Sequence, residues 1–111
     1  MLNQVVLVGR LTDNVELDNT DNGKKVASIC MAVQRSYKNV SGEYETDFIK
    51  CILWNGIAEN TSEYCKKGDI VGIKGRLQTS NYTDDKNTKH YVTEVVAEKV
   101  TFLSSKKEGK D

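Results

Sequence analysis

One short segment of the chain switches to helical spacing, and this switch most constrains the fold. In residues 57–65 the apolar and small side chains recur at intervals that place them on one face of a helix. They are Ile57, Ala58, Thr61, Tyr64 and Cys65. Two lysines and then Gly68 follow, which suits the C-terminal end of a helix because cations favour the helix dipole and glycine tolerates positive φ. We therefore predict a single short helix over residues 57–65.

The other regular segments alternate or are rich in β-branched residues, so they are predicted to be strands. These segments are residues 4–11, 25–35, 46–54, 70–79 and 90–103. One helix between the third and fourth of five strands is the plan of the OB-fold, an all-β Greek-key barrel that often binds oligonucleotides. An SH3-like barrel lacks a helix at that point, and a ferredoxin-like domain needs a second helix.

Length and composition predict one domain without a metal or cofactor. The 111 residues suffice for a single core, which we place in residues 1–103, with a short disordered charged tail at 104–111. No apolar run is long enough for a membrane helix and no signal peptide begins the chain, so a cytoplasmic location is expected. Cys30, Cys51 and Cys65 are widely spaced and His90 is the only histidine, which favours small buried thiols over a zinc site.

The charges balance overall but are unevenly distributed. The chain has 16 basic and 16 acidic residues. Residues 11–23 hold only acidic charges, whereas bases outnumber acids in residues 66–92. A neutral total is therefore compatible with a basic surface backed by an acidic one, and a mixed solvated surface remains the alternative.

The third predicted strand, residues 46–54, has two different faces. One face is mostly apolar, and the other places Lys50 between the rings of Phe48 and Trp54. If that face is exposed, unpaired bases could stack on the rings while Lys50 lies near a phosphate. The alternative is a strand buried on both faces, because Phe and Trp are usually well buried.

Several segments resemble the SSB family of bacterial single-stranded DNA-binding proteins. The resemblance extends over about residues 1–103 and is carried by NQVVLVGRL at 3–11, TDFIKCILW at 46–54, EYCKKG at 63–68, KGRLQT at 74–79 and YVTEVVA at 91–97. It implies single-stranded DNA binding without sequence specificity, in replication, recombination, repair or DNA uptake. It also implies a homotetramer and a nucleoid-associated location, or the host cytoplasm if the protein is phage-encoded.

The resemblance also implies which side chains bind DNA. Matching segment to segment, the stacking positions of the family fall on Tyr37, Phe48, Trp54 and Tyr82. The cations expected to contact phosphates are Arg35, Lys38, Lys50, Lys74, Arg76, Lys86 and Lys89.

The chain departs from replicative members of the family at its C-terminus. It ends in KKEGKD at 106–111 instead of a long tail with an acidic tip, so tail-mediated recruitment of replication or repair enzymes is not expected. A truncated chain and a native short form both fit this ending.

The alternatives to single-stranded DNA binding are a nuclease, a protein-interaction module and an RNA-binding module. A metal-dependent OB-fold nuclease would need clustered carboxylates, which the sequence lacks, whereas a protein-interaction module and an RNA-binding module remain open.

Overall fold

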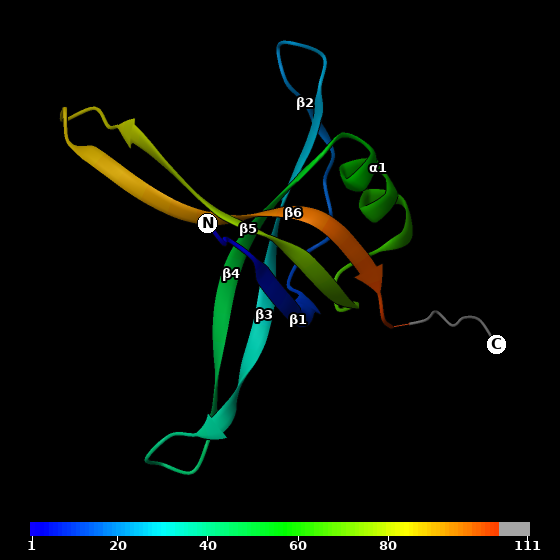
Figure 1. Ribbon diagram of the computed structural model, residues 1–111, viewed down its shortest axis with the longest axis vertical. Helices are drawn as coiled ribbons and strands as arrows, with labels where there is room; N and C mark the ends of the chain where they lie inside the picture. The colour runs from blue at the N-terminus through cyan, green and yellow to red at the C-terminus, as the bar shows by residue number, and fades with distance from the viewer. Residues whose placement is uncertain (105–111) are drawn as a thin grey trace.

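Six strands and one helix form the fold of residues 1–104, the part of the chain that the computed structural model describes (Figure 1). In chain order they are β1 (Val5–Leu11), β2 (Asp18–Asn19), β3 (Lys25–Lys38), β4 (Tyr44–Trp54), α1 (Asn55–Tyr64), β5 (Ile70–Thr83) and β6 (Lys89–Phe102). The five predicted strands and the predicted helix are all present in the predicted order. β2 is an additional two-residue strand that pairs with the start of β3.

Five of the strands close into a barrel. Neighbouring strands follow the order β1-β5-β6-β4-β3, and β1 closes the ring by pairing with β3 at Arg10 and Leu11. The β4–β6 pair is parallel and the other pairs are antiparallel. With α1 between the third and fourth barrel strands, this is the topology of an OB-fold, and the predicted fold class is confirmed.

Two glycines permit the strands to close. A Cβ atom at Gly9 would lie 2.6 Å from the carbonyl oxygen of Ala32, where β1 crosses β3. A Cβ at Gly75 would lie 2.2 Å from the carbonyl oxygen of Val96, at the irregularity in the β5–β6 register. At both Gly9 and Gly75 the backbone of a neighbouring strand therefore lies too close for a side chain.

The barrel interior is filled by the inward side chains of the strands and by one face of α1. Met31, Cys51 and Leu53 are fully buried, and Ala58 and Thr61 of α1 pack over one end of this core. Burial raises the pKa of the Cys51 thiol to about 12, so this thiol stays protonated. The prediction of buried thiols is confirmed for Cys51 and Cys65, whereas Cys30 is only half-buried.

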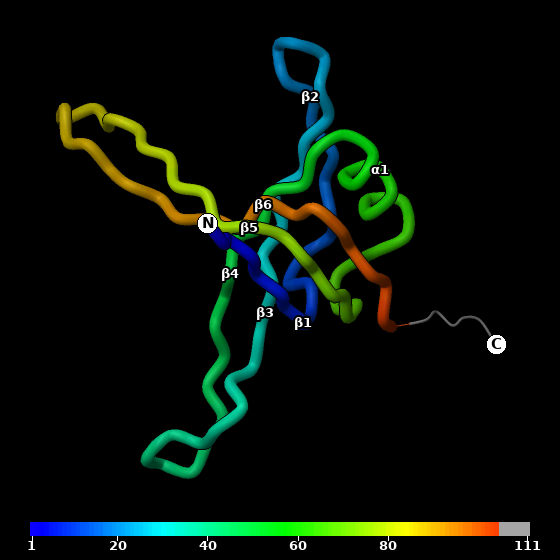
Figure 2. Tube along the Cα trace, viewed as in Figure 1, coloured from blue at the N-terminus to red at the C-terminus, as the bar shows by residue number. Residues whose placement is uncertain are grey.

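The β3–β4 and β5–β6 hairpins extend beyond the barrel as arms, which the tube view separates clearly (Figure 2). The β3–β4 arm turns at residues 39–43, and the β5–β6 arm turns at residues 84–88. In both turns an Asx side chain accepts two backbone N–H groups: Asn39 accepts from Ser41 and Glu43, and Asp84 accepts from Lys86 and Thr88. The strands are thus longer than predicted, because their polar outer ends are paired with each other rather than with the core.

The described residues end just beyond the barrel. Ser104 donates its backbone N–H to the carbonyl of Ile70 and accepts the Ile70 N–H on its side chain. The charged tail predicted for residues 104–111 otherwise lies outside the described residues. Among residues 1–104, no helix has the length and apolar character needed to cross a membrane.

Candidate nucleic-acid interface

The outer face of β4 carries two exposed rings. Because side chains alternate along a strand, Cys51 and Leu53 enter the core while Phe48, Lys50 and Trp54 point away from it. Phe48 is 69% exposed and Trp54 is 38% exposed. The alternative in which β4 is buried on both faces is therefore wrong.

Small side chains on β3 keep this face open. Phe48 lies opposite Ala32 in the β3–β4 ladder, and Lys50 lies opposite Cys30. A methyl group and a thiol are too short to cover a neighbouring ring. The Phe48 ring is therefore available to a flat ligand from the solvent side.

The β3–β4 arm adds two further exposed tyrosines. Tyr37 lies where the register of β3 slips against β4, and it is 65% exposed. Tyr44 belongs to the same face of β4 as Phe48, and the ammonium of Lys38 lies 5.8 Å from its ring centroid. The sequence analysis missed Tyr44, which continues the alternation of Phe48 and Trp54 and would have been found by extending the predicted strand two residues.

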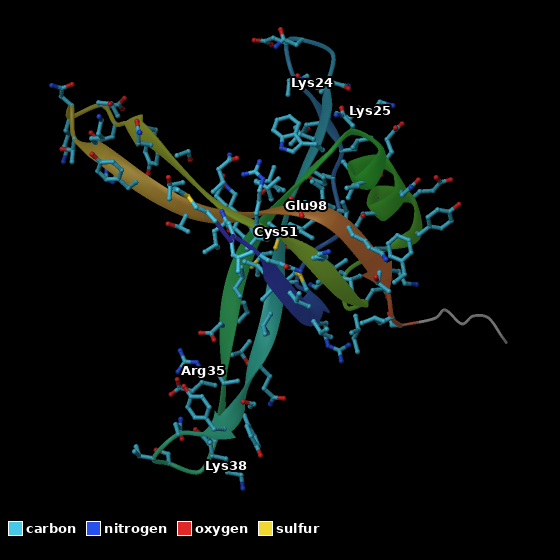
Figure 3. The ribbon with its side chains drawn as sticks, viewed as in Figure 1. Lys24, Lys25, Arg35, Lys38, Cys51 and Glu98 are labelled. Atoms are coloured by element: carbon cyan, nitrogen blue, oxygen red, sulfur yellow. The ribbon has the colours of Figure 1, made fainter. Side chains whose placement is uncertain are left out.

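Arg35 is paired with acidic side chains of β4. Its guanidinium binds both carboxylate oxygens of Asp47, at 3.1 and 2.9 Å, and Glu45 at 2.8 Å. The hydrogen bond from Arg35 holds the pKa of Asp47 below its usual value, and Asp47 in turn raises that of Arg35. Figure 3 shows Arg35 on the β3–β4 arm. Asp47 and Phe48 occupy opposite faces of β4, so the Arg35–Asp47 pair braces the arm on the face away from Phe48.

The β5–β6 arm presents Tyr82 on the outer face. Tyr82 is 55% exposed, and the His90 ring stacks on it with the two ring centroids 4.9 Å apart. Lys86 lies in the turn of this arm. Lys89 follows the turn, and its ammonium lies 6.0 Å from the ring centroid of the exposed Tyr91, a second ring that the sequence analysis did not select.

Acidic side chains of β6 share the outer face with the predicted cations. The Lys50 ammonium lies 3.2 Å from a Glu94 oxygen, and Arg76 lies 4.0 Å from Glu98. Among residues 1–104, the other predicted lysines have no carboxylate partner within 4.0 Å: Lys38, Lys74, Lys86 and Lys89. The outer face thus carries both positive and negative side chains. This agrees with the alternative of a mixed surface, which the sequence left open beside a basic one.

The arrangement is suited to binding rather than to metal chemistry. The part of the chain that the structure describes contains no group of three or more His, Cys, Asp or Glu side chains that could hold a metal ion. It does contain a row of exposed rings on β4, with Tyr37 on the β3–β4 arm and both Tyr82 and Tyr91 on the β5–β6 arm. Exposed rings beside cations are the usual platform for unpaired bases.

Comparison with known proteins assigns the family. The sequence pattern of the Single-strand binding protein family matches residues 2–103. Single-stranded DNA-binding protein B of Bacillus subtilis (strain 168) is 50% identical over 106 residues, which are 96% of this chain and 94% of the relative. Single-stranded DNA-binding protein A of the same organism is 51% identical over 109 residues, 98% of this chain and 63% of the relative.

A third relative extends the comparison to another genus. Single-stranded DNA-binding protein 3 of Listeria innocua is 50% identical over 109 residues, which cover 98% of this chain and 68% of the relative. The family match includes the whole barrel and both arms. The chain therefore belongs to the single-strand binding protein family.

Proposed function

We propose that this chain binds single-stranded DNA without sequence specificity, by stacking bases on its exposed rings and contacting phosphates with lysine and arginine. The observation that carries the proposal is the open outer face of β4, where Phe48 and Trp54 are exposed in a chain of this family. The proposed role is to hold single strands during replication, recombination, repair or uptake of DNA. A cytoplasmic, DNA-associated location is part of the same proposal.

The spacing of the rings favours an extended strand over a single bound nucleotide. Phe48 and Trp54 are six residues apart on one strand, which corresponds to roughly 20 Å. Tyr44 continues this row on the β3–β4 arm, and Tyr82 lies on the other arm. A ligand that reaches all of these rings must be several nucleotides long and must have its bases free.

Stacking explains why the chain would bind single strands in preference to duplexes and why it would not discriminate between base sequences or sugars. Every base has a π-face, so rings accept any sequence, and each stack contributes about 1–3 kcal/mol. Paired bases are already stacked inside a duplex and do not reach the rings. The sugar is not read by stacking, so RNA single strands are the second candidate ligand.

The phosphate contacts are proposed for the cations beside the rings. Lys86 has no carboxylate partner within 4.0 Å among the described residues, so it is immediately available to a phosphate. Lys74 also has none, but it lines the same pocket as Val6 and Val8, so its phosphate contact requires that pairing between copies leaves it exposed. Lys50 must exchange Glu94 for a phosphate. The remaining proposed contacts are Lys38, Arg76 and Lys89, while Arg35 contributes by bracing the arm.

We also propose that the chain acts as a homotetramer. Val6 and Val8 point outward from β1 and are exposed, and they line an apolar pocket of about 260 Å³ together with Leu103. β1 pairs with β5 along residues 5–10 but with β3 only at Arg10 and Leu11. Among residues 1–104, the edge of β1 that faces away from β5 therefore has no partner strand at residues 5–8. An apolar strand with a free edge is suited to pairing with a second copy. Sedimentation at micromolar protein should give four times the monomer mass, and a monomer at that concentration would contradict this part of the proposal.

The main proposal is tested by competition. A labelled oligo(dT) bound to the protein is displaced with unlabelled single-stranded DNA, duplex DNA of the same sequence, or oligo(U), while fluorescence anisotropy is recorded. We expect single-stranded DNA of any sequence to compete and duplex DNA to compete at least about tenfold more weakly. Equal competition by duplex would mean that phosphate contacts alone bind the nucleic acid. Stronger competition by oligo(U) would identify RNA as the ligand.

A further inference from the structure

Three side chains at the tip of the β5–β6 arm form a connected unit, which we call the arm clip: Tyr82, His90 and Asp84. The Tyr82 and His90 rings are nearly parallel, with 18° between their planes and 4.9 Å between their centroids. Nε2 of His90 lies 2.7 Å from Oδ2 of Asp84. The second carboxylate oxygen, Oδ1, accepts the backbone N–H groups of Lys86 and Thr88, both at 2.9 Å.

The arm clip fixes the orientation of the Tyr82 ring. The turn holds Asp84, Asp84 holds the imidazole, and the imidazole covers one face of Tyr82. Tyr82 is nevertheless 55% exposed, so its other face is open to solvent. A ring that is held in place before binding loses less side-chain freedom when a base stacks on it.

The hydrogen bond to Asp84 also determines where a second proton enters the imidazole. With Asp84 ionised, Nε2–H donates to it, and the hydrogen bond from His90 lowers the pKa of this carboxyl. Further protonation therefore takes place at Nδ1, which has no hydrogen-bond partner among residues 1–104. A phosphate of a bound strand would supply the missing acceptor and would favour the imidazolium.

The charges around His90 determine whether DNA affinity should rise or fall as the pH is lowered. Tyr82 faces it from β5, and Asp84 faces it from the turn, which also carries Asp85 and Lys86; Lys89 is turned to the other side of the arm, over Tyr91. A neutral His90 leaves the Asp84 charge uncompensated beside the DNA backbone. An imidazolium would cancel that charge, so the arm would repel the DNA backbone less at acidic pH.

We propose that His90 is a positioning residue for Tyr82 and that it couples single-stranded DNA affinity to pH, with tighter binding at acidic pH. The inference rests on the proposed function, since it concerns one of the proposed stacking rings. It adds two residues, His90 and Asp84, that neither the sequence analysis nor the family comparison assigned to DNA binding.

The test compares the whole chain with His90→Phe and His90→Ala. Phenylalanine keeps a ring against Tyr82 but does not titrate or bond to Asp84, whereas alanine removes the ring as well. Affinity for a rhodamine-labelled oligo(dT) is measured by anisotropy from pH 8.5 to 5.5 at several fixed salt concentrations. Circular dichroism on each variant confirms that the barrel is folded. Since the chain has one histidine, the difference between wild type and His90→Phe isolates its titration.

Two results are expected. At pH 8.5, His90→Ala binds about three- to tenfold more weakly than wild type and His90→Phe recovers most of the loss, because a ring again supports Tyr82. On acidification, the wild type gains affinity relative to His90→Phe, and its dependence of log affinity on log salt steepens by about 0.7, the value for one additional phosphate contact with a single strand. Parallel pH profiles and equal salt slopes for the two proteins would overturn the inference.

A Tyr82→Ala protein separates this inference from the proposed function. If wild type binds and Tyr82→Ala is weakened while both His90 variants follow the wild type at every pH, only the arm clip is refuted. If the wild type does not bind oligo(dT) at low salt, the proposed function itself fails.

Discussion

Replacing Phe48 by alanine should weaken DNA binding far more than it destabilises the fold. Phe48 is 69% exposed, so only about a third of its surface is removed from water in the folded chain. Burying a whole phenylalanine side chain contributes about 1.5–3 kcal/mol, and the truncation should therefore lower the free energy of unfolding by about 0.5–1 kcal/mol. The loss of one base stack is larger, about 1–3 kcal/mol, or roughly a five- to 150-fold weaker affinity.

Two control variants are compared with Phe48→Ala. Leu53→Ala removes a fully buried side chain from the inner face of the same strand, and it should lower the free energy of unfolding by about 2–5 kcal/mol. Tyr64→Ala removes an exposed ring from α1, outside the proposed interface, and it should leave DNA affinity unchanged.

The assay pairs urea denaturation with oligo(dT) anisotropy on the same protein samples. The reasoning is refuted if Phe48→Ala binds as tightly as the wild type. It is also refuted if Phe48→Ala lowers the free energy of unfolding as much as Leu53→Ala does, because Phe48 would then belong to the core.

Three further predictions follow from single contacts. Gly75→Ala should lower the free energy of unfolding by about 1–3 kcal/mol, measured by urea denaturation, because the added methyl group would meet a backbone carbonyl of β6. Glu94→Gln should tighten oligo(dT) binding about two- to fivefold in low-salt anisotropy titrations, because it releases Lys50 for a phosphate. The Arg35–Asp47 bond lowers the pKa of the Asp47 carboxyl, so its contribution to the β3–β4 arm is complete above the ordinary carboxyl range and is lost as the pH falls below about 4. NMR amide shifts of the arm should follow this loss, and Arg35→Gln should produce the same shifts at neutral pH.

Each of these predictions has a result that contradicts it. Wild-type stability for Gly75→Ala would mean that the β5–β6 irregularity does not need a glycine. Unchanged or weaker binding by Glu94→Gln would mean that Lys50 does not exchange its carboxylate for a phosphate. Arm amides that stay unshifted in Arg35→Gln would show that the ion pairs do not brace the arm.

The barrel could be predicted from the sequence because its signals are local. The helical spacing of residues 57–65 lies between clean alternating segments, and the order of these segments fits few small folds. The two faces of residues 46–54 could also be assigned, since alternation needs no knowledge of the partner strand. Whether Phe48 is exposed depends on which of the two faces packs in the core. The structure buries the face of Cys51 and Leu53, which leaves Phe48 exposed.

The arms and the charge pairing could not be predicted in the same way. The outer ends of β3, β4, β5 and β6 are polar, and they are strands only because each pairs with its neighbour across a turn. Tyr44 therefore fell outside the predicted strand. The pairs Lys50–Glu94 and Arg35–Asp47 join residues from different strands, so they depend on registers that alternation within one strand does not specify.

The fluorescence of Trp54 during titration with poly(dT) tests the central claim most directly. Trp54 is the only tryptophan of the chain, so the signal reports a single site on the outer face of β4. The account predicts strong, saturable quenching at low salt, because a stacked base would cover the exposed part of the indole. Binding of poly(dT) in an anisotropy assay without any change in Trp54 emission would contradict it, because the strand would then follow another surface.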